Sequence, residues 1–214
     1  MSGQKTACAC SGRAGKTRGF TLIEILVATL ILAILAVAAY GGLNSLIKER
    51  EITHTHNEHF RTLQLAMATI GRDLSQAAAR PVRLSSGTFA PAMMGGANNI
   101  PVLAFTRNGR PNPLQEPRSD LERIAYLLDG TTLKREVFPV LDRSATLAPA
   151  ARTLLAGVSS ITLAFMDESR QSHAHWPPLN AEPGAYVRRE PIAVQITLDT
   201  KRWGKIRRLI PVTP

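Results

Sequence analysis

The sequence contains few side chains that could carry out chemistry, and they occur in small groups. Cys8 and Cys10 form one group, and three histidines at 54, 56 and 59 form a second. Two thiols without further ligands cannot complete a tetrahedral zinc site. His54 and His56 lie on opposite sides of a helix, so only His56 and His59 would share a face. Neither group therefore predicts a metal site.

The second half of the chain adds two further candidates. Asp167 and Glu168 are adjacent carboxylates at a predicted strand end. Too few other oxygen ligands follow them at regular spacing for a calcium site, so a solvated turn is favoured. His173 and His175 stand beside Trp176-Pro177-Pro178 and are interpreted as part of an ordered loop. The sequence has no nucleophile elbow, phosphate loop or metalloprotease helix. We therefore expect no catalytic, metal or cofactor site, and a protein that is not an enzyme.

Glu24 is unusual because it lies inside an apolar segment. Residues 20–40 are otherwise apolar apart from Thr21 and Thr29. At a rise of ~1.5 Å per residue this segment is about 30 Å long as a helix, which matches the hydrocarbon core of a bilayer. A carboxylate there costs on the order of 2.5–3.5 kcal/mol on insertion scales, so it is normally paired or functional. Its partner could be the α-amino group of a neighbouring subunit. Alternatively, the side chain could reach the lipid headgroups from the helix end.

The charge distribution orients the segment. The chain of 214 residues has a net charge of +10, and the first 19 residues contain four cations and no acid. The positive-inside rule therefore places the N-terminus in the cytoplasm and the rest of the chain across the membrane. A secretory signal would be shorter and would be cleaved after its apolar stretch. The remaining cations are spread out and not interleaved with aromatic residues, which does not favour nucleic-acid binding.

Residues 16–24, Lys-Thr-Arg-Gly-Phe-Thr-Leu-Ile-Glu, resemble the processing site of type IV pilins and type II secretion pseudopilins. In that family a dedicated prepilin peptidase cuts after the glycine and methylates the new N-terminal phenylalanine. The resemblance implies cleavage between Gly19 and Phe20, N-methylation of Phe20, and a role for Glu24 in subunit docking. Cleavage would remove both cysteines with a leader that is long for the family.

We expect the helix to continue beyond the membrane. An apolar stripe with spacings of three and four runs through Phe60, Leu63, Met67, Ile70 and Leu74. The stripe is expected to pack on the chain's own sheet, with a partner-helix surface on its membrane-proximal half as the alternative. Gly41-Gly42 is a point where local unwinding is expected, and Pro81 ends the pattern.

The rest of the sequence indicates short strands. Residues 85–99 suggest a loop, 100–106 a strand, and 149–157 a short helix. Asp129-Gly130 between two apolar runs predicts a hairpin. Alternating patterns predict further strands over 161–165, 192–198 and 206–210.

The expected fold is therefore α+β and pilin-like, with a long N-terminal helix, membrane-spanning in its first half, packed on an antiparallel sheet of about six strands. The predicted organisation is a cleaved leader over 1–19, a transmembrane helix over 20–46, its periplasmic continuation over 47–80, and a β-rich domain over 82–214.

Segments from residue 18 onward resemble the J-type minor pseudopilin of type II secretion, in the order found in that family. They include Arg72–Ala77, Arg80–Arg83, Phe105–Gly109, Leu127–Gly130, Val140–Arg143, Gly157–Ser159, Trp176–Pro178 and the two final strands. The resemblance implies a single-pass protein of the bacterial inner membrane with its C-terminal domain in the periplasm.

The same resemblance implies a structural role. Members join minor pseudopilins of the I, K and H types at the tip of a short periplasmic filament. That complex primes assembly of the major pseudopilin, and the filament helps to export folded proteins across the outer membrane. The alternative is a minor type IV pilin for adhesion, motility or DNA uptake. Such pilins often carry a C-terminal disulfide loop, which this chain cannot form once its leader is removed.

Overall fold

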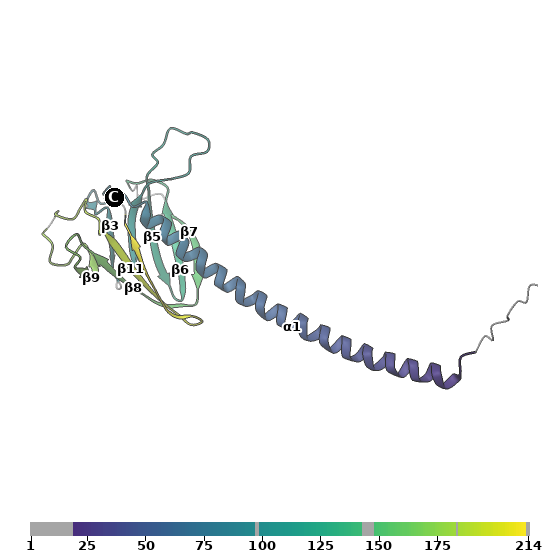
Figure 1. Ribbon diagram of the computed structural model, residues 1–214. Helices are drawn as coiled ribbons and strands as arrows, with labels where there is room; N and C mark the ends of the chain where they lie inside the picture. Colours follow the sequence, from purple (N-terminus) through teal and green to yellow (C-terminus); the bar gives the residue numbers. More distant parts are fainter. Residues whose placement is uncertain (1–18, 97–98, 143–147, 183, 213–214) are drawn as a thin grey trace, which may run out of the picture. The chain divides into compact units, whose positions relative to one another are not determined.

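The computed structural model describes residues 19–96, 99–142, 148–182 and 184–212 (Figure 1). The predicted leader, with Cys8 and Cys10, lies outside these residues except for Gly19. The chain divides into two units, Met1–His56 and Asn57–Pro214. Each unit is described separately below.

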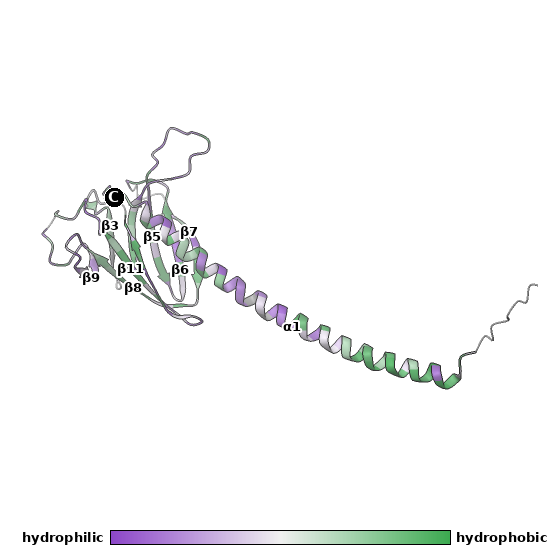
Figure 2. Ribbon diagram, in the orientation of Figure 1, coloured by the Kyte–Doolittle hydropathy of each residue, from purple (hydrophilic) through white to green (hydrophobic). Residues whose placement is uncertain are grey.

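The first unit consists, in its described part, of the N-terminal portion of helix α1 (Leu22–Ser75). This portion is apolar over most of its length (Figure 2), and its large apolar side chains from Phe20 to Ile47 are exposed. The helix is long and apolar enough to cross a membrane. Gly41 and Gly42 are both helical, so the expected local unwinding is not observed.

In the second unit α1 ends at Ser75, five residues before the predicted end at residue 80. The last turn tightens, with the N–H groups of Gln76 and Ala77 donating to the carbonyls of Asp73 and Leu74. Ala77 then forms an isolated β-bridge with Arg107. The chain leaves the helix early because its backbone groups pair with a strand instead.

In the described residues after α1, twelve strands are arranged in three antiparallel sheets. They are β1 (Val82–Arg83), β2 (Phe89–Ala90), β3 (Met93–Gly96), β4 (Leu103–Arg107), β5 (Glu122–Asp129), β6 (Thr132–Phe138), β7 (Ala150–Ala156), β8 (Val158–Met166), β9 (Ser172–His173), β10 (His175–Trp176), β11 (Ala193–Thr200) and β12 (Gly204–Pro211). The six-stranded sheet has the order β10-β3-β4-β5-β6-β7, and the four-stranded sheet has the order β12-β11-β8-β9. Strands β1 and β2 pair separately.

Several sequence expectations were wrong in detail. The segment 149–157 is strand β7 rather than a helix, because it pairs along β6, and this tertiary pairing overrides the helix propensity of its alanines. The expected loop over 85–99 contains β2 and β3, and the strand expected from residue 100 begins at Leu103. The described part of the chain therefore contains twelve strands, twice the expected number of about six.

The Asp-Gly hairpin is confirmed. Asp129 pairs with Thr132 across a two-residue loop in which Gly130 has a φ of 57°. A positive φ at this position favours glycine, because an L side chain is strained there.

One core joins the helix and the two larger sheets. The predicted stripe of α1 is buried at Leu63, Met67, Ile70 and Leu74, whereas Phe60 remains 45% exposed. A small apolar cavity is lined by Ile70 of α1 together with residues of the six-stranded and four-stranded sheets. Burying each large apolar side chain contributes about 1.5–3 kcal/mol. The stripe therefore packs on the chain's own sheets, as predicted.

Candidate functional site

The predicted processing site lies immediately before α1. Gly19 and Phe20 are exposed and outside the helix. Thr21 occupies the N-cap position, and its carbonyl accepts hydrogen bonds from the N–H groups of Glu24 and Ile25. The Thr21 side chain also accepts from the N–H of Glu24, at 3.4 Å. The Thr-x-x-Glu spacing is that of a capping box, which defines where a helix starts.

Glu24 lies four residues after Phe20, which precedes the helix. Within α1, residues four apart lie on the same face, so Glu24 and Ala28 share one face, and both line a hollow together with Phe20. An acidic side chain in the first turn also interacts favourably with the positive end of the helix dipole. Within residues 19–56, the Glu24 carboxylate has no ion pair or hydrogen bond.

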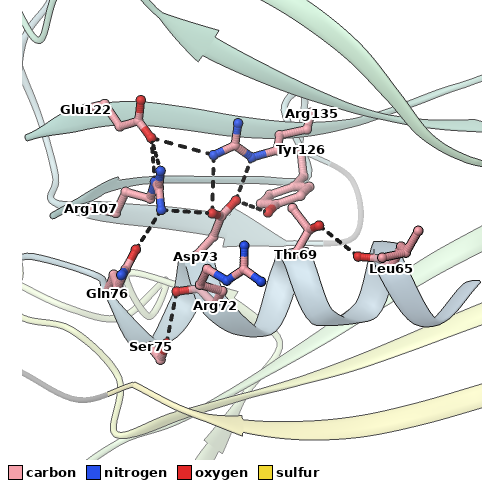
Figure 3. A network of polar contacts seen from close by, with 10 residues as sticks. All are labelled: Leu65, Thr69, Arg72, Asp73, Ser75, Gln76, Arg107, Glu122, Tyr126 and Arg135. Carbon is pink, nitrogen blue, oxygen red and sulfur yellow. Dashed lines mark hydrogen bonds and ion pairs between the residues drawn. The ribbon is translucent and has the colours of Figure 1, made fainter. Parts of the chain in front are cut away.

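The helix end in the second unit is fixed by a buried polar network centred on Asp73 (Figure 3). Asp73 is 2% exposed. Its carboxylate accepts hydrogen bonds from the Tyr126 hydroxyl at 2.5 Å and from Arg135 Nε at 2.6 Å. Arg107 Nη1 lies 3.2 Å from the second oxygen of Asp73. One carboxylate of the helix is thus bound to strands β4, β5 and β6.

A second carboxylate completes the network from the sheet. Glu122 accepts from Arg107 Nε at 2.6 Å and lies 3.7 Å from Arg135 Nη2. Arg107 also donates to the Gln76 side chain at 2.7 Å. Two carboxylates and two guanidinium groups balance in charge, which is the condition under which buried ions are tolerated.

The pKa values of this network follow from its burial. Burial raises the pKa of Tyr126 well above its usual value, and the neighbouring charge of Asp73 raises it further. For Arg135, burial alone would lower the pKa, but the hydrogen bond and charge of Asp73 give a net increase. Both side chains therefore keep their protons at neutral pH, and the network is complete there.

The groups considered as possible ligands are not brought together into a metal site. His54, His56 and His59 are exposed on α1. Across the described residues, no three His, Cys, Asp or Glu side chains gather as metal ligands would. Asp167 instead pairs with His173 at 2.8 Å, and this hydrogen bond lowers the pKa of Asp167.

The sequence motifs do not predict the Asp73 network. Residues 72–77 carry only a resemblance to the J-type family. One signal was available, because Asp73 lies between Ile70 and Leu74 on the buried stripe. A carboxylate at such a position requires a partner, because burying an unpaired charge is costly. Its partners could not be assigned from the sequence, since Arg107, Tyr126 and Arg135 lie 34 to 62 residues further on.

Two family matches cover nearly the whole chain. Residues 15–40 match the prokaryotic N-terminal methylation motif. Residues 41–212 match the family described as Type II secretion system (T2SS), protein J. The first match contains Gly19, Phe20 and Glu24, and the second contains every residue of the Asp73 network.

Relatives and a solved structure agree with this result. Type II secretion system protein J of Escherichia coli is 32% identical over 196 residues, covering 89% of this chain and 94% of the relative. The protein of the same name from Klebsiella pneumoniae is 30% identical over 200 residues, covering 93% and 96%. A chain in the crystal structure of the GspK-GspI-GspJ complex from enterotoxigenic E. coli matches with a TM-score of 0.63 and 28% identity, covering 73% of this chain and 98% of that chain. The pilin-like α+β fold is thereby confirmed, and the chain belongs to the type II secretion system protein J family of minor pseudopilins.

Proposed function

We propose that this pseudopilin joins I-, K- and H-type minor pseudopilins in a complex at the tip of the secretion filament, and that this complex primes assembly of the major pseudopilin. The observation that carries the proposal is the match to the protein J family over residues 41–212. The related structure contains a J-type protein together with GspK and GspI. The role is structural, and no catalytic step is assigned to the chain.

The N-terminal unit serves as the membrane anchor. The prepilin peptidase removes residues 1–19 and methylates Phe20, and the apolar part of α1 then holds the mature protein in the inner membrane. The domain lies in the periplasm. The exposed Gly19–Phe20 bond before the helix cap and the methylation-motif match support this proposal.

Glu24 acts in docking. Its carboxylate lies four residues after Phe20 and has no ion pair or hydrogen bond with residues 19–56 of its own chain. The α-amino group of an adjacent subunit would supply the missing positive charge. Pairing would remove the cost of an isolated carboxylate in the membrane, so leaving the bilayer for the filament becomes favourable only when subunits assemble.

The Asp73 network joins this anchor helix to the globular domain. Force applied along α1 reaches the six-stranded sheet through Asp73 and its partners on β4, β5 and β6. The domain can then move with its helix as the filament grows.

A complementation experiment tests this proposal. A strain that lacks the chain is expected to lose export of folded proteins, and the wild-type gene is expected to restore it. A Gly19→Leu variant should keep its leader, as shown by mass spectrometry of the N-terminus, and should not restore export. A Gly12→Leu variant in the same leader serves as the control and should be processed. Normal export in the deletion strain would refute the proposed role.

A further inference from the structure

A groove opens at the end of the second unit where the chain enters the domain. It has a volume of about 330 Å³ and lies between the start of this unit's helix, the end of β7 and the β11–β12 turn. His59 and Thr62 line it from α1, Leu155 from β7, and Lys201, Arg202 and Trp203 from the turn. The surface that lines the groove is mainly apolar, and its lining residues include the cations Lys201 and Arg202.

The β11–β12 turn that forms one wall is held in a defined conformation. The backbone N–H of Trp203 donates to the hydroxyl oxygen of Thr200 at 3.1 Å, and the same hydroxyl donates to the Gly204 carbonyl at 3.0 Å. The Lys201 N–H donates to the Gly157 carbonyl at 3.0 Å. The Trp203 ring packs beside Phe60, with ring centroids 5.8 Å apart. The wall is therefore built before any ligand arrives.

This turn and strand β12 are strongly basic. Five cations are exposed there, namely Lys201, Arg202, Lys205, Arg207 and Arg208. None of the five has an ion pair within the described parts of the chain. The acid close to these cations in register is Asp199, which lies opposite Lys205 in the β11–β12 pairing. The positive charge is thus largely uncompensated.

The number of residues between the predicted membrane span and the groove limits the distance of the groove from the membrane. Ten residues, 47–56, separate the predicted membrane span from Asn57, where the unit begins. These residues belong to α1, and a helix of this length covers about 15 Å. This short connection limits how far the groove can be from the membrane surface. Tryptophan is enriched at that interface, and exposed Lys and Arg are attracted to anionic lipids.

We propose that the groove and the basic residues beside it bind the headgroups of anionic phospholipids at the surface of the membrane in which the protein is anchored. The lipid phosphates lie against Lys201, Arg202 and His59, and Trp203 lies among the headgroups. The volume of the groove falls within the range of pockets that bind small molecules, so it can hold a lipid headgroup. This inference rests on the proposed membrane anchoring but not on the role in secretion.

Binding of this kind would orient the domain before assembly. A domain held on the membrane presents one constant set of surfaces to other subunits. The contact must break when the subunit leaves the bilayer, so lipid binding would compete with entry into the filament.

Energy transfer from tryptophan to a dansyl-labelled lipid tests the proposal. The full mature chain is reconstituted in two kinds of vesicle. One contains phosphatidylcholine alone, and in the other phosphatidylglycerol replaces about 30% of the phosphatidylcholine. Transfer should rise about twofold in the anionic vesicles and fall again in high salt, which shortens the range of charge interactions. The increase should vanish in a Trp203→Phe variant. Trp176, which is buried, remains in both proteins and provides the background signal.

Charge variants make the test specific. A Lys201→Glu, Arg202→Glu double variant should lose the increase. Arg170→Glu with Arg188→Glu makes the same change in net charge at two exposed positions elsewhere and should keep it. Flotation of every variant with its vesicles would show that membrane insertion is intact. Inorganic phosphate at equal ionic strength should compete no better than chloride if a lipid surface, rather than a free anion, is the ligand. Equal transfer in neutral and anionic vesicles, or equal loss in both double variants, would overturn the proposal.

Discussion

Tyr126 on β5 donates its hydroxyl proton to Asp73 on α1 across 2.5 Å, although 53 residues separate them. Both side chains are at most 3% exposed. The contact fixes the last turn of the helix on the six-stranded sheet. Under the proposed function α1 anchors the protein in the membrane, and this contact then joins the anchor helix to the β-rich domain.

Replacing Asp73 with Asn should destabilise the domain strongly. The amide can still accept from Tyr126, but Arg107 and Arg135 would then face Glu122 alone and leave one buried positive charge. Removing one partner from a buried ion pair costs about 3–5 kcal/mol. Denaturant unfolding of the chain in detergent, followed by near-ultraviolet circular dichroism, would measure the change. Glu116→Gln breaks an exposed pair with Arg118 and should cost at most about 1 kcal/mol. Equal effects of the two substitutions would show that the network contributes little.

Gly95→Ala should also destabilise the domain. A Cβ at this position would lie 2.8 Å from the Val102 carbonyl oxygen and 2.8 Å from Phe165 Cζ. Backbone on one side and a buried ring on the other leave little room to adjust, and overpacking of this kind costs about 1–3 kcal/mol. Gly71→Ala is the matched control, because Gly71 is helical and a Cβ there meets nothing within 4 Å. It should stabilise the helix by about 1 kcal/mol. A stabilising Gly95→Ala substitution would contradict the packing described here.

Glu190 should give the stability of the domain a pH dependence near neutrality. Burial raises the pKa of this carboxyl from 4.5 to about 7. It borders a small cavity with Asp167, Glu168 and Arg189. A raised pKa in the folded state favours the protonated form, so this stabilisation is complete below pH 4.5 and is lost as the pH rises through 7.

The expected result is a melting temperature that falls between pH 5 and pH 8 more in the wild type than in a Glu190→Gln variant. The pKa of Asp167 is lowered, so the stability that its carboxylate contributes is lost only at acid pH, below the range from pH 5 to pH 8. Thermal melts of both proteins across this range would measure the difference. Parallel curves for the two proteins would show that the Glu190 carboxyl titrates normally.

Glu24→Gln should leave membrane insertion intact and impair assembly. The amide is less costly in the bilayer than a carboxylate, but it cannot neutralise the α-amino group of a neighbouring subunit. The measurement is recovery of the variant in complexes with the other minor pseudopilins, beside its content in the membrane fraction. Glu49→Gln changes an exposed carboxylate of the same helix beyond the predicted span and should assemble normally. Full recovery of the Glu24→Gln variant in these complexes would contradict the proposed role of Glu24 in docking.

The sequence predicted the large features well because they depend on local patterns. The apolar segment from Phe20, the α1 stripe and the Asp129-Gly130 hairpin all follow from composition or short-range periodicity. Strand β7 was missed because its alanines favour a helix, and only its pairing with β6 gives it a strand conformation. The early end of α1 likewise depends on a bridge between Ala77 and Arg107.

The candidate sites likewise include one that depends on a local sequence pattern and two that depend on contacts between distant residues. Gly19, Phe20 and Glu24 occur within six residues, so a short motif predicts them, and their roles stay predictions. The Asp73 network and the groove beside Trp203 are formed by residues that are far apart in the sequence. No local pattern connects Asp73 with Arg135, or His59 with Lys201, and only the folded chain brings them together.

Copurification of the mature full-length chain with the other minor pseudopilins of its secretion system is the most direct test of its proposed place at the filament tip. The chain would be coexpressed with its I- and K-type partners, extracted in detergent and captured by a C-terminal tag. We expect a stable complex that contains all three proteins and does not depend on nucleic acid. Recovery of the chain alone, in a folded state and with both partners present in the extract, would contradict its assignment to the filament tip.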